Sequence, residues 1–142
     1  MFAKQLTVFI ENRAGRLSEV LNVLRESEVN ILSLSLADTT EFGLLRLIVD
    51  NAALGKDKLT ENGFSSLLSN VSIIQIPHKA GSLQELLRLV DKGGVNIEYM
   101  YGLSVESKEA YVVIKASDCD KMDEILNANG VKTLSCEDLK HI

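Results

Sequence analysis

The stretch from Asn12 to Ile31, NRAGRLSEVLNVLRESEVNI, returns 66 residues later as HKAGSLQELLRLVDKGGVNI. Eight of the twenty positions are identical, where average residue usage would give roughly one identity by chance. After Ile97 the best offset becomes 67, which places Asn62-Gly63 on Asn129-Gly130. The sequence therefore predicts a duplicated unit, with one domain at residues 1–70 and a second at residues 71–142.

The hydrophobic pattern predicts the same order of elements in both copies. Leu6, Val8 and Ile10 alternate with Gln5, Thr7 and Phe9 as in a strand buried on at least one face, and Ile74 and Ile76 repeat that phase. The other expected strands are Ile31 to Leu36, Leu44 to Val49, Ser65 to Leu68, Ile97 to Val105, Ala110 to Ala116 and Val131 to Leu134. With two helices in each copy, the order is β-α-β-β-α-β twice. This is the α+β, ferredoxin-like arrangement of an antiparallel four-stranded sheet with both helices on one face.

The helices are predicted from apolar stripes that should lie on the sheets. In the first helix of each copy the stripe consists of Leu17, Val20, Leu21 and Leu24, and of Leu83, Leu86, Leu87 and Val90. Gly93-Gly94 is expected to end the helix of the second copy. The other helices are expected from Ala52 to Glu61 and, after a cap at Ser117 or Asp118, as far as Asn129.

Composition narrows the class of protein. The 142 residues carry a net charge of -5, and their basic side chains are interspersed with acidic ones, which disfavours a nucleic-acid partner. No run approaches the ~20 apolar residues of a membrane span, so a cytoplasmic protein with no membrane partner is expected. Cys119 and Cys136 are expected to be reduced, and the two histidines offer no metal site. Neither a cofactor motif nor a supported catalytic base and nucleophile is found, so no cofactor, catalytic residue or enzyme activity is expected.

One constellation could bind a ligand. The turn Glu11-Asn12-Arg13-Ala14-Gly15-Arg16-Leu17 precedes the first helix, and Asn30 follows eighteen residues after Asn12. The second copy keeps this spacing between His78 and Asn96. A glycine at a helix start allows close approach of an anion to backbone N–H groups. Because an asparagine both donates and accepts, Asn12 and Asn30 could bind the carboxylate and ammonium groups of an amino acid together.

Structural explanations stand beside this interpretation. Gly15 and Gly81 could serve tight packing of a helix on a sheet. Asn30 and Asn96, each between a helix end and a strand, could be left-handed residues or turn residues that bind no ligand. Arg13, Arg16 and Lys79 could be solvated surface charges.

These residues and the element order resemble the ACT domain, and particularly the serine-sensing domain that ends bacterial phosphoglycerate dehydrogenases. The resemblance covers nearly the whole chain twice. In that family the two asparagines and the loop glycine hold an effector amino acid between adjacent domains. The resemblance implies ligand-binding positions at Asn12, Arg13, Ala14, Gly15, Arg16, Leu17, Asn30, His78, Ala80, Gly81, Ser82, Leu83 and Asn96. Alanines 14 and 80 stand where proline is usual, and a histidine replaces the loop asparagine in the second copy.

The function implied is that of a non-catalytic amino-acid sensor, a homodimer that holds a small-molecule effector at ACT–ACT interfaces. One version is a regulatory subunit of an amino-acid or 2-oxo-acid enzyme, similar to the small subunit of acetolactate synthase. In that version the chain forms its ligand site only together with its partner. The alternatives are an enzyme on the same scaffold and a structural oligomerisation module whose ligand loops have decayed.

Overall fold

The computed structural model describes residues 1–38, 42–103 and 108–141, which form two compact units. The N-terminal unit is Lys4–Ser69, and the C-terminal unit combines Asn70–Ile142 with Met1–Ala3. The α-amino group of Met1 forms an ion pair with Asp123 within the C-terminal unit. Among the helices that the structure describes, none combines the length and the apolar character required to cross a membrane.

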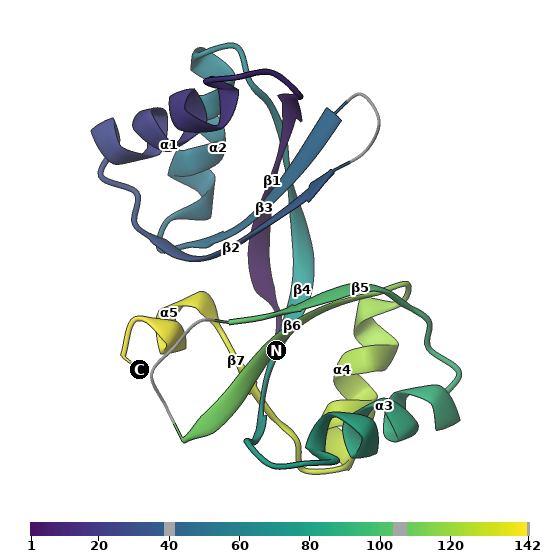
Figure 1. The fold of residues 1–142 in the computed structure, drawn as a ribbon. Helices are drawn as coiled ribbons and strands as arrows, with labels where there is room; N and C mark the ends of the chain where they lie inside the picture. The colour runs from purple at the N-terminus through teal and green to yellow at the C-terminus, as the bar shows by residue number, and fades with distance from the viewer. Residues whose placement is uncertain (39–41, 104–107, 142) are drawn as a thin grey trace. The chain divides into compact units, whose positions relative to one another are not determined.

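The N-terminal unit carries two helices on one face of an antiparallel sheet (Figure 1). Its elements are β1 (Ala3–Glu11), α1 (Arg16–Glu26), β2 (Ile31–Asp38), β3 (Phe42–Val49), α2 (Ala52–Glu61) and the first part of β4 (Ser65–Pro77). The strand order is β2-β3-β1-β4, and β3 runs antiparallel to both β1 and β2. The core of this unit joins Leu6 and Val8 of β1 to Leu24 of α1 and Leu59 of α2.

The C-terminal unit repeats this arrangement. Its elements are the second part of β4, α3 (Ser82–Lys92), β5 (Ile97–Gly102), β6 (Glu109–Ala116), α4 (Cys119–Ala128), β7 (Lys132–Leu134) and α5 (Cys136–Leu139). β6 pairs antiparallel with both β4 and β5, and β7 pairs antiparallel with β4. Its core joins Ile74 and Ile114 of the sheet to Val90 of α3 and Leu126 of α4. The β-α-β-β-α-β order predicted from the sequence is confirmed in both copies.

Three features differ from the predicted elements. The strands expected at Ser65 to Leu68 and around Ile74 are one strand of 13 residues, because no glycine, proline or strong turn pair separates them. α5 was not expected; it is a single turn that begins at a capping box between Ser135 and Asp138. The predicted strand from Ile97 ends at Gly102, and Val105 lies outside the described residues.

The first helix of each unit is turned relative to the predicted stripe. The buried residues of α1 are Val20, Val23 and Leu24, and those of α3 are Ser82, Leu86 and Val90. Leu17 and Leu83, predicted to face the core, are instead among the exposed large hydrophobic residues. These leucines lie in the first helical turn, beside the glycine loops.

The predicted helix ends are confirmed. Asp118 caps α4 by accepting a hydrogen bond from the main-chain N–H of Lys121 at 3.0 Å. Gly93 is the C-cap of α3, and Gly94 follows it with a φ of 74°. Cys119 and Cys136 are both free.

Candidate ligand site

The glycine loop before the first helix has the same backbone geometry in both units. Gly15 and Gly81 are the N-caps of α1 and α3, with φ values of 89° and 87°. A Cβ added at either position would meet no atom within 4 Å. Tight packing therefore does not explain these glycines, and the left-handed conformation, which favours glycine, does.

A pocket of about 270 Å³ opens beside this loop in the N-terminal unit. It is lined by the end of β1, the loop, the first turn of α1 and two strands, through Ile10, Glu11, Asn12, Arg13, Leu17, Leu36, Ala37 and Gly43. Asn12 supplies an amide that can donate and accept, and Leu17 and Leu36 supply apolar walls. Arg13 forms an ion pair with Glu11 at 2.8 Å, and both side chains are more than half exposed. The pocket therefore combines an apolar wall with polar groups that donate hydrogen bonds and polar groups that accept them.

Sequence reasoning identified Asn12, Arg13 and Leu17 but missed the residues that β2 and β3 contribute. Gly43 pairs with Ile10, and Ala37 pairs with Leu44, so the end of β2 and the start of β3 lie beside the end of β1, where the loop begins. The signal that could have found them is the antiparallel register of three adjacent strands, which places the end of β1 beside the end of β2.

The same register separates Asn12 from Asn30 within one unit. Asn12 follows the end of β1, which lies beside the end of β2, whereas Asn30 precedes Ile31, the first residue of β2. The eight residues of β2 span roughly 25 Å at about 3.3 Å per residue. One unit therefore does not bring the two asparagines to a common ligand, contrary to what their spacing in sequence suggested.

The main chains of Asn30 and Asn96 are both held by hydrogen bonds. The N–H of Asn30 donates to the carboxylate of Asp50 at 2.9 Å, and the N–H of Asp50 donates to the carbonyl of Asn30 at 3.0 Å. In the C-terminal unit the N–H of Ser117 donates to the carbonyl of Asn96 at 2.9 Å. Neither asparagine has a positive φ, so the left-handed conformation is wrong for both.

The other predicted residues are placed as follows. Arg16 does not line the loop pocket; it forms an ion pair with Glu19 at 2.6 Å, and its Cζ lies 4.4 Å from the centroid of the Phe64 ring. The loop residues Ala14, His78, Lys79, Ala80 and Gly81 are exposed. Ser82, which matches Arg16, is buried, whereas Leu83, which matches Leu17, is exposed.

The arrangement suits binding of a small polar molecule with an apolar part. Asn12 lies just ahead of the positive end of α1, which favours a carboxylate. Within residues 1–38, 42–103 and 108–141, no group of three or more His, Cys, Asp or Glu side chains is placed to hold a metal ion.

A family model described as "ACT domain pair" matches residues 1–142. The chain belongs to this ACT domain pair family. A search of the curated proteins found no match.

Several solved structures share the fold of this ACT domain pair. A crystal structure of protein BT0572 from Bacteroides thetaiotaomicron is 37% identical with a TM-score of 0.93, over 100% of this chain and 98% of that one. The regulatory subunit of aspartate kinase from Thermus thermophilus is 16% identical with a TM-score of 0.62, over 88% of each chain. That from Thermus flavus is 15% identical with a TM-score of 0.59, over 90% of this chain and 91% of that one. At these identities the two aspartate kinase subunits show the fold alone.

Proposed function

We propose that this ACT domain pair is a non-catalytic regulatory protein that binds an amino acid at its glycine loop. One ACT domain occupies residues 1–70 and the other residues 71–142. The observation that carries the proposal is the pocket of about 270 Å³ that joins Asn12 to an apolar wall beside the helix start. An amino acid offers the carboxylate, ammonium and side chain that such a pocket can bind.

The binding site for the effector would be completed by a second chain. Asn30 lies at the opposite end of its unit from Asn12, so a ligand that contacts both needs two ACT units. Leu34 and Leu36 pair with the buried Leu47 and Leu45, yet each is 52% exposed. Apolar side chains left uncovered beside a pocket favour an interface, and we propose a homodimer in which the loop of one chain faces the strand β2 of its partner.

Regulation would follow from the ligand's preference for one arrangement of ACT domains. A ligand shifts an equilibrium only by its difference in affinity for the two states, typically about 1–3 kcal/mol of coupling. The fold relatives named as regulatory subunits of aspartate kinase make an amino-acid metabolic enzyme the class of partner to test.

A thermal-shift screen of the purified chain against the twenty amino acids tests binding. A ligand at ~100 times its Kd stabilises the protein by about 2.7 kcal/mol, which raises the Tm by several degrees. Asn12→Ala and Asn30→Ala should each abolish the shift. Asn22→Ala, an exposed asparagine on α1, is the matched control and should preserve it. No shift with any amino acid in a cooperatively folded sample would contradict the proposal of a free-standing sensor.

Mixing two variants tests the shared site. A heterodimer of Asn12→Ala and Asn30→Ala chains would hold one intact site, built from the unmutated loop of one chain and the unmutated Asn30 of the other. We expect the mixture to regain part of the thermal shift that neither variant shows alone. If the mixture stays unresponsive while both chains still dimerise, the proposed arrangement is wrong.

A further inference from the structure

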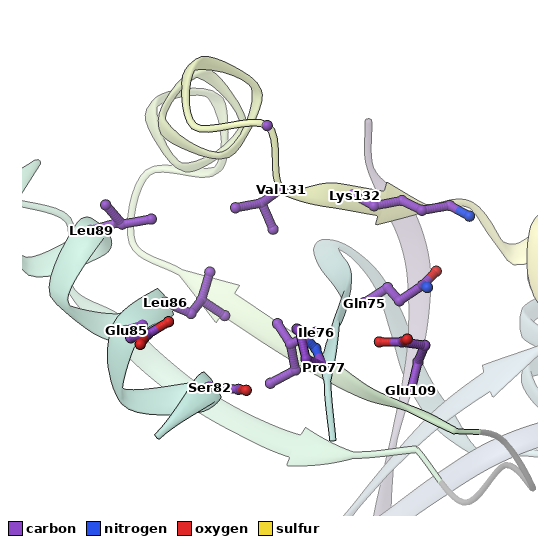
Figure 2. Close-up of a pocket in the computed structure, with 11 residues that line it drawn as sticks. Gln75, Ile76, Pro77, Ser82, Glu85, Leu86, Leu89, Glu109, Val131 and Lys132 are labelled. Atoms are coloured by element: carbon purple, nitrogen blue, oxygen red, sulfur yellow. The ribbon is translucent and has the colours of Figure 1, made fainter. Parts of the chain in front are cut away.

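A second pocket lies in the C-terminal unit, where Pro77 and Ser82, on either side of the loop residues 78–81, line it but the loop residues do not. Its volume is about 340 Å³, within the range of roughly 300–1,000 Å³ typical of small-molecule sites. It is lined by Gln75, Ile76, Pro77, Ser82, Glu85, Leu86, Leu89, Glu109, Gly130, Val131 and Lys132. Figure 2 shows Leu86, Leu89 and Val131 grouped between α3 and the start of β7, with Glu85 on one side.

One polar group in this lining has no hydrogen-bond partner. Ser82 is the first residue of α3 and is only 7% exposed. Its Oγ is shielded from solvent and makes no hydrogen bond among the described residues. A buried polar atom left unpaired destabilises the fold, and a ligand in the pocket would offset that cost by bonding to it.

The duplication shows what fills the corresponding place in the other unit. There Arg16 holds the position of Ser82, and Phe64 holds the position of Val131. The guanidinium of Arg16 lies over the ring of Phe64 and bonds to Glu19, and its side chain is 18% exposed. The N-terminal unit therefore supplies its own guanidinium to this place.

The C-terminal unit lacks both bulky residues but keeps the acid. Ser82 and Val131 are small, whereas Glu85 matches Glu19 and stands three residues after Ser82, as Glu19 does after Arg16. Glu85 makes no ion pair among the described residues. In the N-terminal unit, the ion pair between Glu19 and Arg16 holds a guanidinium by a charge-assisted hydrogen bond.

The charge of the lining also favours a cation. The lining contains the carboxylates of Glu85 and Glu109 and the ammonium group of Lys132, so it carries one net negative charge. Figure 2 shows Lys132 extending along β7 on the side of Gln75 and Glu109, whereas Glu85 lies on α3. Glu85 therefore places a negative charge near the start of α3, three residues after Ser82.

We propose that this pocket binds a small molecule with a guanidinium group on a short aliphatic chain. The guanidinium donates hydrogen bonds to the carboxylate of Glu85 and to the Oγ of Ser82. The aliphatic chain packs on Leu86 and Val131. This site is separate from the amino-acid site proposed above and does not depend on it.

Agmatine, a four-carbon alkylguanidine, is the probe for a calorimetric titration of the full chain. We expect binding to the unmodified protein, and Glu85→Gln should weaken it by about tenfold or more, since one charge-assisted hydrogen bond is lost. Glu19→Gln is the matched control, because Glu19 already pairs with Arg16, and it should leave the agmatine affinity within about twofold. Asn12→Ala should also leave the agmatine affinity unchanged, which separates this site from the loop pocket of the N-terminal unit.

A second experiment places a guanidinium from the protein itself in the pocket. The double substitution Ser82→Arg and Val131→Phe copies the residues of the N-terminal unit, and we expect a folded protein that no longer binds agmatine. If the double variant does not fold, Ser82→Arg alone gives the same test. Absence of agmatine binding up to about 10 mM, or binding that survives both Glu85→Gln and Ser82→Arg, would overturn the proposal.

Discussion

Asn30 and Asp50 are joined by two reciprocal hydrogen bonds, of 2.9 Å to the Asp50 carboxylate and 3.0 Å to the Asn30 carbonyl. Both bonds use the main chain of Asn30, whose side chain is free of structural hydrogen bonds in the described part of the chain. The pair fixes where β2 begins relative to the end of β3. The asparagine side chain is thereby positioned without contributing to the fold.

This relationship separates a structural role from a binding role. Asn30→Ala should change the free energy of unfolding by less than about 0.5 kcal/mol, because it leaves the main-chain bonds in place. Asp50→Ala removes one acceptor and should cost about 1–2 kcal/mol. Urea denaturation of both variants measures the difference. A larger loss from Asn30→Ala than from Asp50→Ala would contradict the structure at this corner.

Glu28 has the conformation that glycine has at the matching place in the other unit. Its φ is 57°, and that of Gly94 is 74°. Left-handed backbone costs a non-glycine residue free energy. We expect Glu28→Gly to raise the free energy of unfolding by about 0.5–1 kcal/mol, and Gly94→Ala to lower it by a similar amount.

Thermal unfolding of the two variants measures these opposite changes. A Cβ at residue 94 would meet only the Lys121 Nζ, at 3.9 Å, so Gly94→Ala reports backbone strain without a clash. The prediction fails if Glu28→Gly lowers the Tm.

The rotation of α3 gives a prediction from two leucines three residues apart. Leu83 is 38% exposed, whereas Leu86 is 3% exposed. Leu86→Ala should lower the free energy of unfolding by about 2–5 kcal/mol through lost burial and the cavity left behind. Leu83→Ala should cost less than about 0.5 kcal/mol. Equal losses in chemical denaturation would support the stripe predicted from sequence instead.

The duplication made most of the fold predictable, since each copy supports the reading of the other. The helix spacing could not show which side of α1 and α3 faces the sheet, because leucines occupy both the buried face and the exposed first turn. Likewise, the spacing of Asn12 and Asn30 could not show that they lie at opposite ends of a unit. That separation depends on strand register, which is set by pairing between residues distant in sequence.

The pocket at Ser82 could not be predicted from the sequence for a related reason. The resemblance to the ACT domain implies that Ser82, which follows Gly81, is a ligand-binding position. The helix turns its side chain into the unit, where it is buried. Its meaning emerges only from comparison with Arg16, whose contacts with Glu19 and Phe64 come from the folded structure.

The capping box of α5 leads to a dependence on pH. The carboxylate of Asp138 accepts a hydrogen bond from the N–H of Ser135 at 2.8 Å, and the Ser135 Oγ accepts one from the N–H of Asp138 at 3.1 Å. The bond from the Ser135 main chain holds the pKa of Asp138 below its ordinary value. Because the folded state has the lower pKa, the box stabilises α5 above the ordinary pKa of aspartate, about 4, and loses this effect as the pH falls through the lowered value.

We therefore expect the amide of Asp138 to lose protection from hydrogen exchange as the pH falls below about 4, before the global unfolding transition. Asp138→Asn should remove this step, because an amide does not titrate in that range. Protection factors measured by NMR for both proteins test the prediction. Protection at residue 138 that stays constant down to the acid unfolding transition would show that the capping box does not control the stability of α5.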